Sequence, residues 1–462
     1  MWLWTNLRTD ISMSEDNEED LDVFVVALDE DGNEIEDTHD PLAHLNVDAE
    51  GRLDLTYTDD LYRRMEYDKG DRFAIYKLMA YFREDVVRGG KIFCAGAGAL
   101  GNEVLKNFAL LGVGELWFAD FDDIDASNLA KSVLFRPTDI GRAKVDVAAE
   151  RLAQMDPEID LHPISADVRF GIGLGVFRRM DVLTSVVDSI DARVGFNRIA
   201  AALGKPWLDA GIGELSWRVS CWDPPGGPCF ECTMDDTMRY QQHLPYAPSC
   251  APMAEAIRDM QRQPTSPLAA AMSGALLAQE ALKLLHDVRM EEPPPELTMP
   301  HGAQFYFGGG DPYLETQLRR PVDGCPGHDY WGEVLEVPEF KAATTTLREL
   351  LERAGEALGV AVQATSIRLG FDLIHEVYCH PCGHRAEYFS PARSRFVDLT
   401  CPQCGGEARP DYKRALRATE RFADRPLAAL GFPPLHIFLV YGGDGRIAIE
   451  LTGDEEEVMG GR

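Results

Sequence analysis

The chain has 462 residues, 45% of them hydrophobic, and its 77 acidic against 45 basic residues give a net charge of -32. This length exceeds one ordinary domain, so we expect two or three domains with at least one large core. The acidic balance argues against a nucleic-acid partner, because phosphate backbones are bound by clustered lysine and arginine. No apolar run suggests a membrane span and no signal peptide is recognisable, which predicts a cytoplasmic protein without a membrane partner.

The N-terminal region is predicted to hold little regular structure. Residues 1–20, rich in acidic side chains toward their end, are expected to form a disordered and solvated tail. Short β-prone runs between turn residues predict a small β segment over residues 21–58. Hydrophobic residues at helical spacing then predict one helix over residues 71–87, ended by Gly89 and Gly90.

Residues 59–335 alternate strand-like and helix-like segments. This alternation indicates an α/β, Rossmann-like domain with a parallel sheet covered by helices. Its first βαβ unit is KIFCAGAGALGNEVLKNFALLGVGELWFADFD, residues 91–122. Near its end, residues 267–286 form a small-residue helix that we expect to be buried, since Gln279, Glu280 and Lys283 argue against a membrane span.

The pattern changes after the proline-rich connector MEEPPPELTMP. From residue 336 to 462, one amphipathic helix over residues 346–358 and several β segments predict a separate C-terminal α+β domain.

A glycine-rich turn joins the first buried strand to its helix. Gly96, Gly98 and Gly101 form GxGxxG, in which missing side chains let backbone N–H groups and the helix N-terminus approach phosphates. Asp120 ends the next strand, where dinucleotide-binding folds place a ribose-binding carboxylate. These two features alone would also fit a hydride-transfer enzyme.

The stretch DFDDIDASNL, residues 120–129, favours an enzyme that binds a nucleoside triphosphate over one that transfers a hydride. Hydride transfer needs one acid at the strand end, whereas this chain adds further polar and charged residues, namely Asp122, Ser127, Asn128, Lys131, Arg136 and Lys144. Alternating acids and bases fit a site that binds a triphosphate with Mg²⁺ and brings in another anion. We interpret Asp123 and Asp125 as part of a solvated loop.

Four motifs in order, GAGALG, DFDDIDASNL, DIGRAKV and VVDSIDARVGFNRIAA, resemble the ThiF/MoeB-like adenylation domain of the ubiquitin-activating enzyme family. The resemblance covers residues 59–335. It implies that the C-terminal carboxylate of a ubiquitin-like protein attacks the α-phosphate of ATP, which releases pyrophosphate and leaves an acyl adenylate. Attack of one anion on another needs cations and preorganised donors.

The resemblance also implies roles for single residues. Asp120 would hold the ribose, Asn128 and Lys144 would contact phosphates, and Asp188 would bind Mg²⁺; the alternative for Asp188 is to cap the following helix, for which Asp191 is better placed. The expected ATP site comprises Gly96, Gly98, Gly101, Asp120, Asp122, Asn128, Lys131, Lys144 and Asp188. The expected catalytic side chains are Cys250, Lys144, Asp188, Lys131, Arg136 and Arg64.

Two of these assignments depart from the family pattern or are loosely aligned. The family usually reads Asn-Leu-x-Arg-Gln, whereas this chain has Lys131 and Ser132 at the last two positions. Lysine keeps the charge but loses the bidentate fork, so Arg136 is a candidate to compensate. Arg64 aligns with an arginine that reaches the ATP of a partner protomer, and an ordinary surface arginine is the alternative.

Four cysteines have the spacing of a four-thiolate zinc ribbon over residues 379–404, namely Cys379, Cys382, Cys401 and Cys404. Gly383, Gly405 and Gly406 suit its knuckle turns. Such a site is structural, because a catalytic zinc keeps an open position.

A second zinc site is predicted from Cys229, Cys232, Cys325 and His328. By resemblance, bacterial family members carry two Cys-x-x-Cys pairs at corresponding places, so His328 would replace the fourth cysteine. The alternative is a solvent-exposed His328 beside free thiols.

The remaining cysteines are Cys94, Cys221 and Cys250. We expect Cys94 and Cys221, which lie in strand patterns, to be small core residues. Cys250 lies in a proline-rich segment where relatives have a crossover loop with a reactive cysteine, so its thiolate would attack the acyl adenylate to give a thioester. An inert loop cysteine is the alternative.

Together these features predict an enzyme using ATP, Mg²⁺ and Zn²⁺ that adenylates a ubiquitin-like protein, holds it on Cys250 and passes it to a conjugating enzyme. The resemblance extends to activating enzymes of bacterial ubiquitin-like conjugation operons linked to antiviral defence, and it implies a homodimer. Two alternatives stay open: a sulfur-carrier adenylyltransferase of the thiamin or molybdopterin type, and a binding scaffold with an inactive site.

Overall fold

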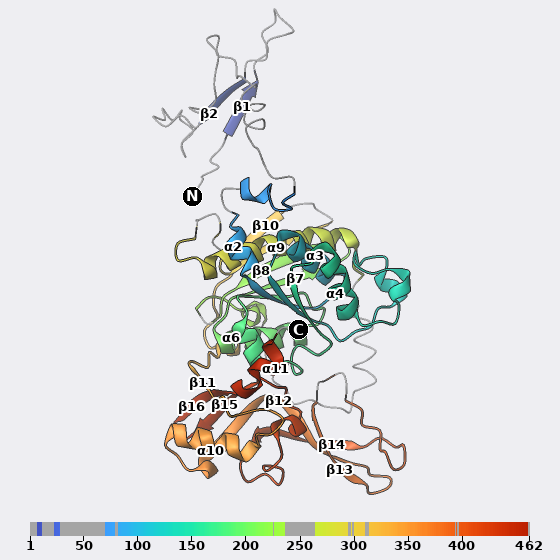
Figure 1. Ribbon diagram of the computed structural model, residues 1–462, viewed down its shortest axis with the longest axis vertical. Helices are drawn as coiled ribbons and strands as arrows, with labels where there is room; N and C mark the ends of the chain where they lie inside the picture. Colours follow the sequence, from blue (N-terminus) through green and yellow to red (C-terminus); the bar gives the residue numbers. More distant parts are fainter. Residues whose placement is uncertain are drawn as a thin grey trace, which may run out of the picture. The chain divides into compact units, whose positions relative to one another are not determined.

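The computed structural model describes residues 7–11, 23–27, 70–78, 82–224, 226–235, 264–293, 297, 300–309, 314–392, 394 and 397–460 (Figure 1). Contacts divide the chain into two units, Met1–Phe82 and Arg83–Arg462. In the first unit, β1 (Leu7–Ile11) and β2 (Val23–Ala27) pair as antiparallel strands. The prediction of disorder over residues 1–20 is therefore wrong for β1, whose backbone groups find partners on β2.

The predicted continuous helix over residues 71–87 is also wrong. A 3-10 helix covers Tyr76–Leu78 and a short helix, α2, covers Glu84–Arg88, with an extended backbone at Arg83. The Asp71 side chain accepts a hydrogen bond from the N–H of Phe73 at 2.8 Å. Such a local side-chain bond favours a turn over the first turn of a longer helix.

An eight-stranded sheet forms the centre of the second unit, in the order β10-β9-β8-β7-β6-β3-β4-β5. Neighbours from β7 through β5 are parallel, which confirms a Rossmann-like core, and β8, β9 and β10 extend it in antiparallel fashion. The sequence did not predict this extension, because the antiparallel neighbours β8 and β9 are separated by a long intervening segment. The strands are β3 (Lys91–Ala95), β4 (Glu115–Ala119), β5 (Asp160–Ile164), β6 (Val182–Ser185), β7 (Trp207–Ile212), β8 (Trp217–Trp222), β9 (Ala303–Phe307) and β10 (Leu314–Leu318).

Helices cover both faces of this sheet (Figure 1). The α3, α4 and α9 helices lie on one face, where α3 contacts both of the others, and α5 and α6 lie together on the opposite face. A parallel sheet requires this arrangement, because each crossover helix packs back onto the strands it connects. The helices are α3 (Ala99–Leu111), α4 (Lys144–Met155), α5 (Leu174–Arg179), α6 (Ile190–Leu203) and α9 (Pro267–Arg289).

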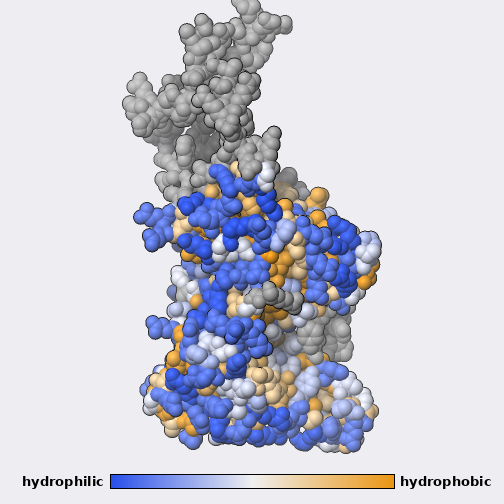
Figure 2. Space-filling model, viewed as in Figure 1, coloured by the Kyte–Doolittle hydropathy of each residue, from blue (hydrophilic) through white to orange (hydrophobic). Residues whose placement is uncertain are grey.

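The small-residue helix α9 has the length and hydropathy of a membrane span, but 56% of its most apolar window is buried inside the protein. It packs against α3, β7 and β8. Figure 2 shows a visible face that is largely hydrophilic, with separate hydrophobic patches instead of a continuous apolar band. These findings confirm the predicted burial of α9 as a core helix.

A second sheet, of six strands, lies in the C-terminal region and is accompanied by helix α10 (Leu347–Leu358). Thr346 and Glu349 form a capping box at the start of α10, and Gly359 ends it in a left-handed conformation. The sequence predicted this helix and the strands β15 and β16. The strands are β11 (Val334–Glu336), β12 (Thr365–Tyr378), β13 (Arg385–Pro391), β14 (Arg409–Leu416), β15 (Ile437–Gly442) and β16 (Gly445–Glu450).

The C-terminal sheet shares a hydrophobic core with the α5 and α6 face of the large sheet. Ile437 and Ala448 belong to the same buried cluster as Phe177 of α5 and Phe196 of α6. Approach is close at Gly173, where an added Cβ would lie 2.1 Å from the carbonyl oxygen of Pro434. The predicted domain boundaries at residues 58 and 335 stay predictions, while the contacts place residues 83–462 in one unit.

A fully buried carboxylate reinforces this shared core. Glu450, at the end of β16, is 0% exposed and lies 2.6 Å from Nη2 of Arg178, and it also contacts the guanidinium of Arg179. Arg179 forms a further ion pair at 2.8 Å with Glu455 of α11 (Glu455–Met459), which is half exposed. Two cations from α5 thus compensate one buried anion from the C-terminal sheet.

We predict that Glu450→Gln lowers the free energy of unfolding by about 3 kcal/mol, because it removes the fully buried anion shared by Arg178 and Arg179 and leaves them only the more exposed Glu336 and Glu455. Glu455→Gln, which removes an exposed partner of the same Arg179, should cost less than about 1 kcal/mol. Urea unfolding followed by tryptophan fluorescence would measure both. Equal effects of the two substitutions would contradict a special role for Glu450.

Candidate functional site

The order of the parallel strands defines where a ligand is expected. The chain passes from β3 to β4 and β5 on one side, and then to β6 and β7 on the other side of β3. Open α/β sheets bind ligands in the crevice outside the carboxyl ends of the strands at such a reversal of strand order. The glycine turn follows β3, Asp120 follows β4 and Asp188 follows β6, so the topology brings these predicted site residues to one edge.

The glycine turn has the conformation that its sequence predicts. Gly96 has a φ of +106°, which disfavours any residue with a side chain, and an added Cβ on Gly101 would lie 2.2 Å from the carbonyl oxygen of Gly96. Gly98 precedes the first residue of α3 and has no atom within 4 Å of an added Cβ. Among the described residues, the space beside the N-terminal residue of α3 is therefore open, as binding of an anion at a helix N-terminus requires.

The Asp120 carboxylate ties the glycine turn to the end of β4. Its Oδ2 accepts a hydrogen bond from the N–H of Ala97 at 2.8 Å, and its Oδ1 accepts one from the N–H of Asp122 at 2.9 Å. Burial raises the pKa of Asp120, while Lys144 and the two N–H groups act against that rise. Asp120 is thus a preorganised acceptor in the predicted ribose position.

Lys144 holds two of the neighbouring acids together. Its Nζ lies 2.9 Å from Oδ2 of Asp122 and 3.9 Å from Oδ1 of Asp120, and the side chain is largely buried at the start of α4. The remaining two acids of this stretch, Asp123 and Asp125, are exposed, which confirms the predicted solvated loop. Asp125 accepts hydrogen bonds from the N–H groups of Ser127 and Asn128. The crowded carboxylates are therefore compensated within the protein itself.

Three predicted phosphate contacts are engaged with neighbouring protein groups. Asn128 accepts a hydrogen bond from the N–H of Asp125 at 3.0 Å, and Lys131 donates one to Oγ1 of Thr265 at 3.2 Å. The Arg136 guanidinium donates to the carbonyl oxygens of Val133 and Phe135. The predicted phosphate roles of Asn128, Lys131 and Arg136 stay predictions.

Asp188 is exposed three residues beyond the end of β6. The cap of the following helix α6 is Ser189, whose side chain accepts a hydrogen bond from the N–H of Ala192 at 3.1 Å. The expectation that Asp191 would be the better cap is therefore wrong, because Ser189 occupies the capping position. Since Ser189 caps α6, the Asp188 carboxylate is not used for this purpose.

Sequence reasoning missed Asn102, a fully buried residue one position after the last motif glycine. Its amide Nδ2 donates to the carbonyl oxygens of Ala97 and Gly98 at 2.8 and 2.9 Å. Its Oδ1 accepts from the N–H of Leu134 at 2.9 Å. Asn102 thus joins the glycine turn to the loop that carries Lys131, and a polar residue on the buried face of α3 was the available signal.

Two predicted catalytic residues, Arg64 and Cys250, lie outside the described residues. The cysteines in the described part of the chain are free of disulfides. Cys94 and Cys221 are both 0% exposed within β3 and β8, which confirms their assignment to the core. Burial raises the pKa of the Cys94 thiol to about 12, so it remains protonated at neutral pH.

The predicted zinc-ribbon cysteines come together in the C-terminal sheet. Their ligand atoms lie within 4.8 Å of one another, with Sγ of Cys379 and Cys404 3.4 Å apart and Sγ of Cys382 and Cys401 3.7 Å apart. Gly383 and Gly405 have φ values of +73° and +71°, as the predicted knuckle turns require. A tetrahedral zinc with Zn–S bonds of about 2.3 Å needs sulfur atoms about 3.8 Å apart, so this group fits zinc.

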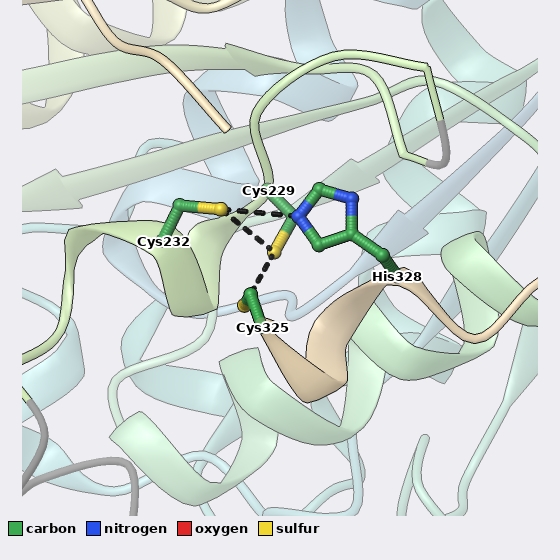
Figure 3. Close-up of side chains that lie close together, drawn as sticks. All are labelled: Cys229, Cys232, Cys325 and His328. Atoms are coloured by element: carbon green, nitrogen blue, oxygen red, sulfur yellow. Dashed lines mark hydrogen bonds between the residues drawn. The ribbon is translucent and has the colours of Figure 1, made fainter. Parts of the chain in front are cut away.

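The second predicted group also converges (Figure 3). Sγ of Cys229 lies 3.7 Å from Sγ of both Cys232 and Cys325, and Sγ of Cys232 lies 3.0 Å from Nε2 of His328. These separations are too long for disulfides and approach a tetrahedral ligand set of three sulfurs and one nitrogen. Hydrogen bonds from the Cys229 and Cys325 thiols lower the pKa of Cys232, which favours the thiolate form that binds metal.

Asn197 of α6, another residue that sequence reasoning missed, supports this group. Its Oδ1 accepts a hydrogen bond from the N–H of Phe230 at 3.0 Å, and its Nδ2 donates to the carbonyl oxygen of Gly327 at 3.4 Å. The buried Asn197 therefore holds the two ligand-bearing turns on one helix. Gly327 is needed there, because an added Cβ would lie 2.7 Å from Sγ of Cys229.

Comparisons with known proteins agree with this geometry. Residues 77–307 match the ThiF family. SUMO-activating enzyme subunit 2 of Dictyostelium discoideum is 32% identical over 32% of this chain and 22% of its own length. Sulfur carrier protein ThiS adenylyltransferase of Escherichia coli is 27% identical over 51% of this chain and 84% of its own length.

The match is thus to one part of the larger activating enzymes, since the chain spans about a fifth of the SUMO-activating subunit and 12% of human ubiquitin-like modifier-activating enzyme 1. Among solved structures, E. coli MccB with ATP covers 59% of this chain and 80% of its own, at 17% identity and a TM-score of 0.46. The ThiF match covers half of the chain and includes the glycine turn, Asp120, Lys144 and Asp188. The protein is therefore a member of the ThiF family.

Proposed function

We propose that the protein uses ATP to adenylate the C-terminal carboxylate of a ubiquitin-like protein. The observation that carries this proposal is the edge at β3, β4 and β6, where an open helix N-terminus, a preorganised Asp120 and the buried Lys144 meet at the reversal of strand order. Membership of the ThiF family supports it. The named relatives include adenylyltransferases and activating enzymes.

The site residues would divide the nucleotide between them. The glycine turn and the N-terminus of α3 would receive phosphate oxygens, and Asp120, whose carboxylate has further acceptor sites beyond its two N–H bonds, would hold the ribose hydroxyls. Lys144 carries three donor protons, so it can contact a phosphate while it remains paired with Asp122. Asp188 would hold Mg²⁺, since this ion prefers carboxylate oxygen and is most often bound together with substrate phosphates.

The proposed reaction forms one bond and breaks another at phosphorus. A carboxylate oxygen of the incoming protein attacks the α-phosphate, and the bond to the bridging oxygen breaks to release pyrophosphate. The product is an acyl adenylate, a mixed anhydride. Lys144 and the N–H groups at the start of α3 would stabilise the charge that gathers on the phosphate oxygens.

We predict that Asp188→Ala and Lys144→Ala each lower carrier-dependent exchange between pyrophosphate and ATP by about a hundredfold, because each removes a charge placed at the reacting phosphates. Asp123→Ala removes a neighbouring exposed carboxylate and serves as the matched control, with an expected change below about twofold. Radiolabelled pyrophosphate exchange, with a small ubiquitin-like protein as the carrier, would measure these rates. A wild-type chain without exchange would favour the inactive scaffold instead.

We also propose that both cysteine groups bind structural zinc. The sulfur separations support this, and each group offers four ligands and no open position. Zinc in the ribbon would fix β12, β13 and β14, and zinc at the second group would fix the turns near α6.

The zinc proposal predicts two zinc ions per purified chain, measured by plasma mass spectrometry. Cys401→Ser and Cys229→Ser should each lose one ion, because three remaining ligands bind zinc far more weakly. Cys94→Ala changes a cysteine outside both groups and should retain two ions. A wild-type content near zero after purification without chelators would contradict the proposal, and a content near one would limit it to a single group.

For the second half of the reaction, we propose that the Cys250 thiolate attacks the adenylate carbonyl, releases AMP and holds the carrier as a thioester for a conjugating enzyme. This step rests on the family resemblance and on the position of Cys250 in the sequence. The sulfur-carrier alternative, in which sulfur instead receives the acyl group, is supported by the ThiS adenylyltransferase relative.

The two alternatives differ in a covalent adduct. With ATP, Mg²⁺ and the carrier, the thioester route predicts a heavier band on a non-reducing gel that thiols remove and that Cys250→Ala lacks. The Cys250→Ala chain should still exchange pyrophosphate, because adenylation precedes thioester formation. An adduct that persists in Cys250→Ala would contradict this role of Cys250.

We propose a homodimer that acts in the cytoplasm with a conjugating-enzyme partner, on the basis of the family resemblance. The same resemblance favours a role in antiviral defence.

A further inference from the structure

A buried acid bound by two arginines, Asp209, lies within β7, opposite Ser185 at the end of β6. Asp209 is 0% exposed, and its Oδ1 accepts from Nε of Arg193 at 2.9 Å while its Oδ2 accepts from Nη2 of Arg218 at 3.1 Å. Arg193 lies in the first turns of α6, five residues after Asp188. None of the predicted site residues belongs to this group.

The sheet register explains why these residues meet. Gly211 of β7 lies directly opposite Arg218 of β8, and Asp209 lies two residues earlier on the same face of the sheet. Arg193 approaches from α6, which covers that face. Its Nη2 is additionally fixed by the carbonyl oxygen of Ala210 at 2.9 Å.

Both guanidinium groups point to the space that Gly211 leaves free. A Cβ added to Gly211 would lie 3.1 Å from Nη2 of Arg193 and 3.9 Å from Nη2 of Arg218. The side chain of Arg218 is 32% exposed, so part of this group is accessible from solvent. A ligand atom above Gly211 would therefore meet donors from two directions.

The group also has more positive charge and more donors than the protein itself uses. Two guanidinium groups face one carboxylate, which leaves one positive charge in excess. In the part of the chain that the structure describes, the buried Nε of Arg218 has no hydrogen-bond partner. Buried donors are normally satisfied, so this group has unused capacity for an oxyanion.

The strand order indicates whether the arginines would bind a phosphate of the nucleotide or another oxyanion. In the order β7-β6-β3-β4, Asp188 follows β6, the glycine turn follows β3 and Asp120 follows β4. The nucleotide phosphates and ribose are assigned to β3 and β4, whereas the arginines stand on the other side of Asp188. With strands about 5 Å apart, an anion above Gly211 is one strand from Asp188 and two from the glycine turn.

We propose that Arg193 and Arg218 receive the terminal carboxylate of the incoming protein tail and position it for attack on the α-phosphate. This inference rests on the proposed adenylation. Arginine suits the task, because its planar donors match a carboxylate, and Asp209 fixes both side chains before the substrate arrives. The close approach of both guanidinium groups to Gly211 favours a tail that ends in small residues.

The test measures equilibrium binding without ATP, so it does not depend on catalysis. The probe is a fluorescein-labelled peptide that ends in Gly-Gly with a free carboxylate, and its amidated form serves as the matched ligand. We expect Arg218→Ala to weaken binding of the free acid by at least about tenfold, the effect of losing one charge-assisted hydrogen bond. The amide should bind the wild-type chain about as weakly.

Two further variants control for folding and for charge. Arg218→Ala leaves Asp209 paired with Arg193, so the fold should persist, which thermal melting would verify. Arg218→Lys keeps the charge without the planar fork and should restore binding only in part. Arg320→Ala removes an exposed arginine elsewhere and should leave peptide binding unchanged.

Titration calorimetry with ATP and Mg²⁺ tests whether the arginines bind the carboxylate of the tail or a phosphate of ATP. The proposal predicts less than a twofold change in ATP affinity for Arg218→Ala. It is overturned if the amide binds as well as the acid, if Arg218→Ala binds the acid normally, or if the wild-type chain binds neither peptide. Weakened ATP binding with intact peptide binding would assign the arginines to the nucleotide instead, and a failure of the adenylation proposal would show separately in pyrophosphate exchange.

Discussion

The reversal of strand order at β3 is the constraint on which the rest of this structure depends. Because β4 and β6 both pair with β3, their carboxyl ends diverge, and the polar residues that follow these three strands meet at one edge. Glycines are needed there for two separate reasons, a positive φ at Gly96 and close contact at Gly101. The edge offers backbone donors, acceptors and a lysine in one place, which is the combination that transfer of an anion onto a phosphate requires.

Charge compensation within the edge is largely complete before a ligand binds. Lys144 bridges Asp120 and Asp122, the exposed Asp125 caps a short turn, and Asn102 connects the glycine turn to the loop that follows. The arginines near Asp209 are the exception, since they exceed their single acid. Preorganisation of this kind reduces the rearrangement needed when substrate arrives, and it separates residues that maintain the site from residues with capacity for a ligand.

Helix α6 connects the C-terminal region to this edge, because α6 covers the face of the large sheet against which the C-terminal strands pack. Its strands β15 and β16 share a core with α5 and α6, and Glu450 places a buried anion against two arginines of α5. The same α6 begins next to Asp188, carries Arg193 and, through Asn197, holds the turns of a metal-ligand group. One helix thus contributes to the proposed site, to a candidate zinc site and to the shared core.

The sequence by itself determined the local features of this protein. Periodicity predicted the parallel core and α10, GxGxxG predicted the turn at Gly96, and cysteine spacing predicted two groups whose ligand atoms converge, because each of these signals depends on neighbouring residues or on a fixed ligand count. Only the tertiary structure decided that β8 to β10 extend the sheet, that Ser189 caps α6, and that Asn102, Glu450 and the arginines of Asp209 matter. The Ser189 cap is a local hydrogen bond that needs the observed start of α6 to be recognised, whereas the other features depend on which distant segments come into contact, and packing and the desolvation of buried charge determine those contacts.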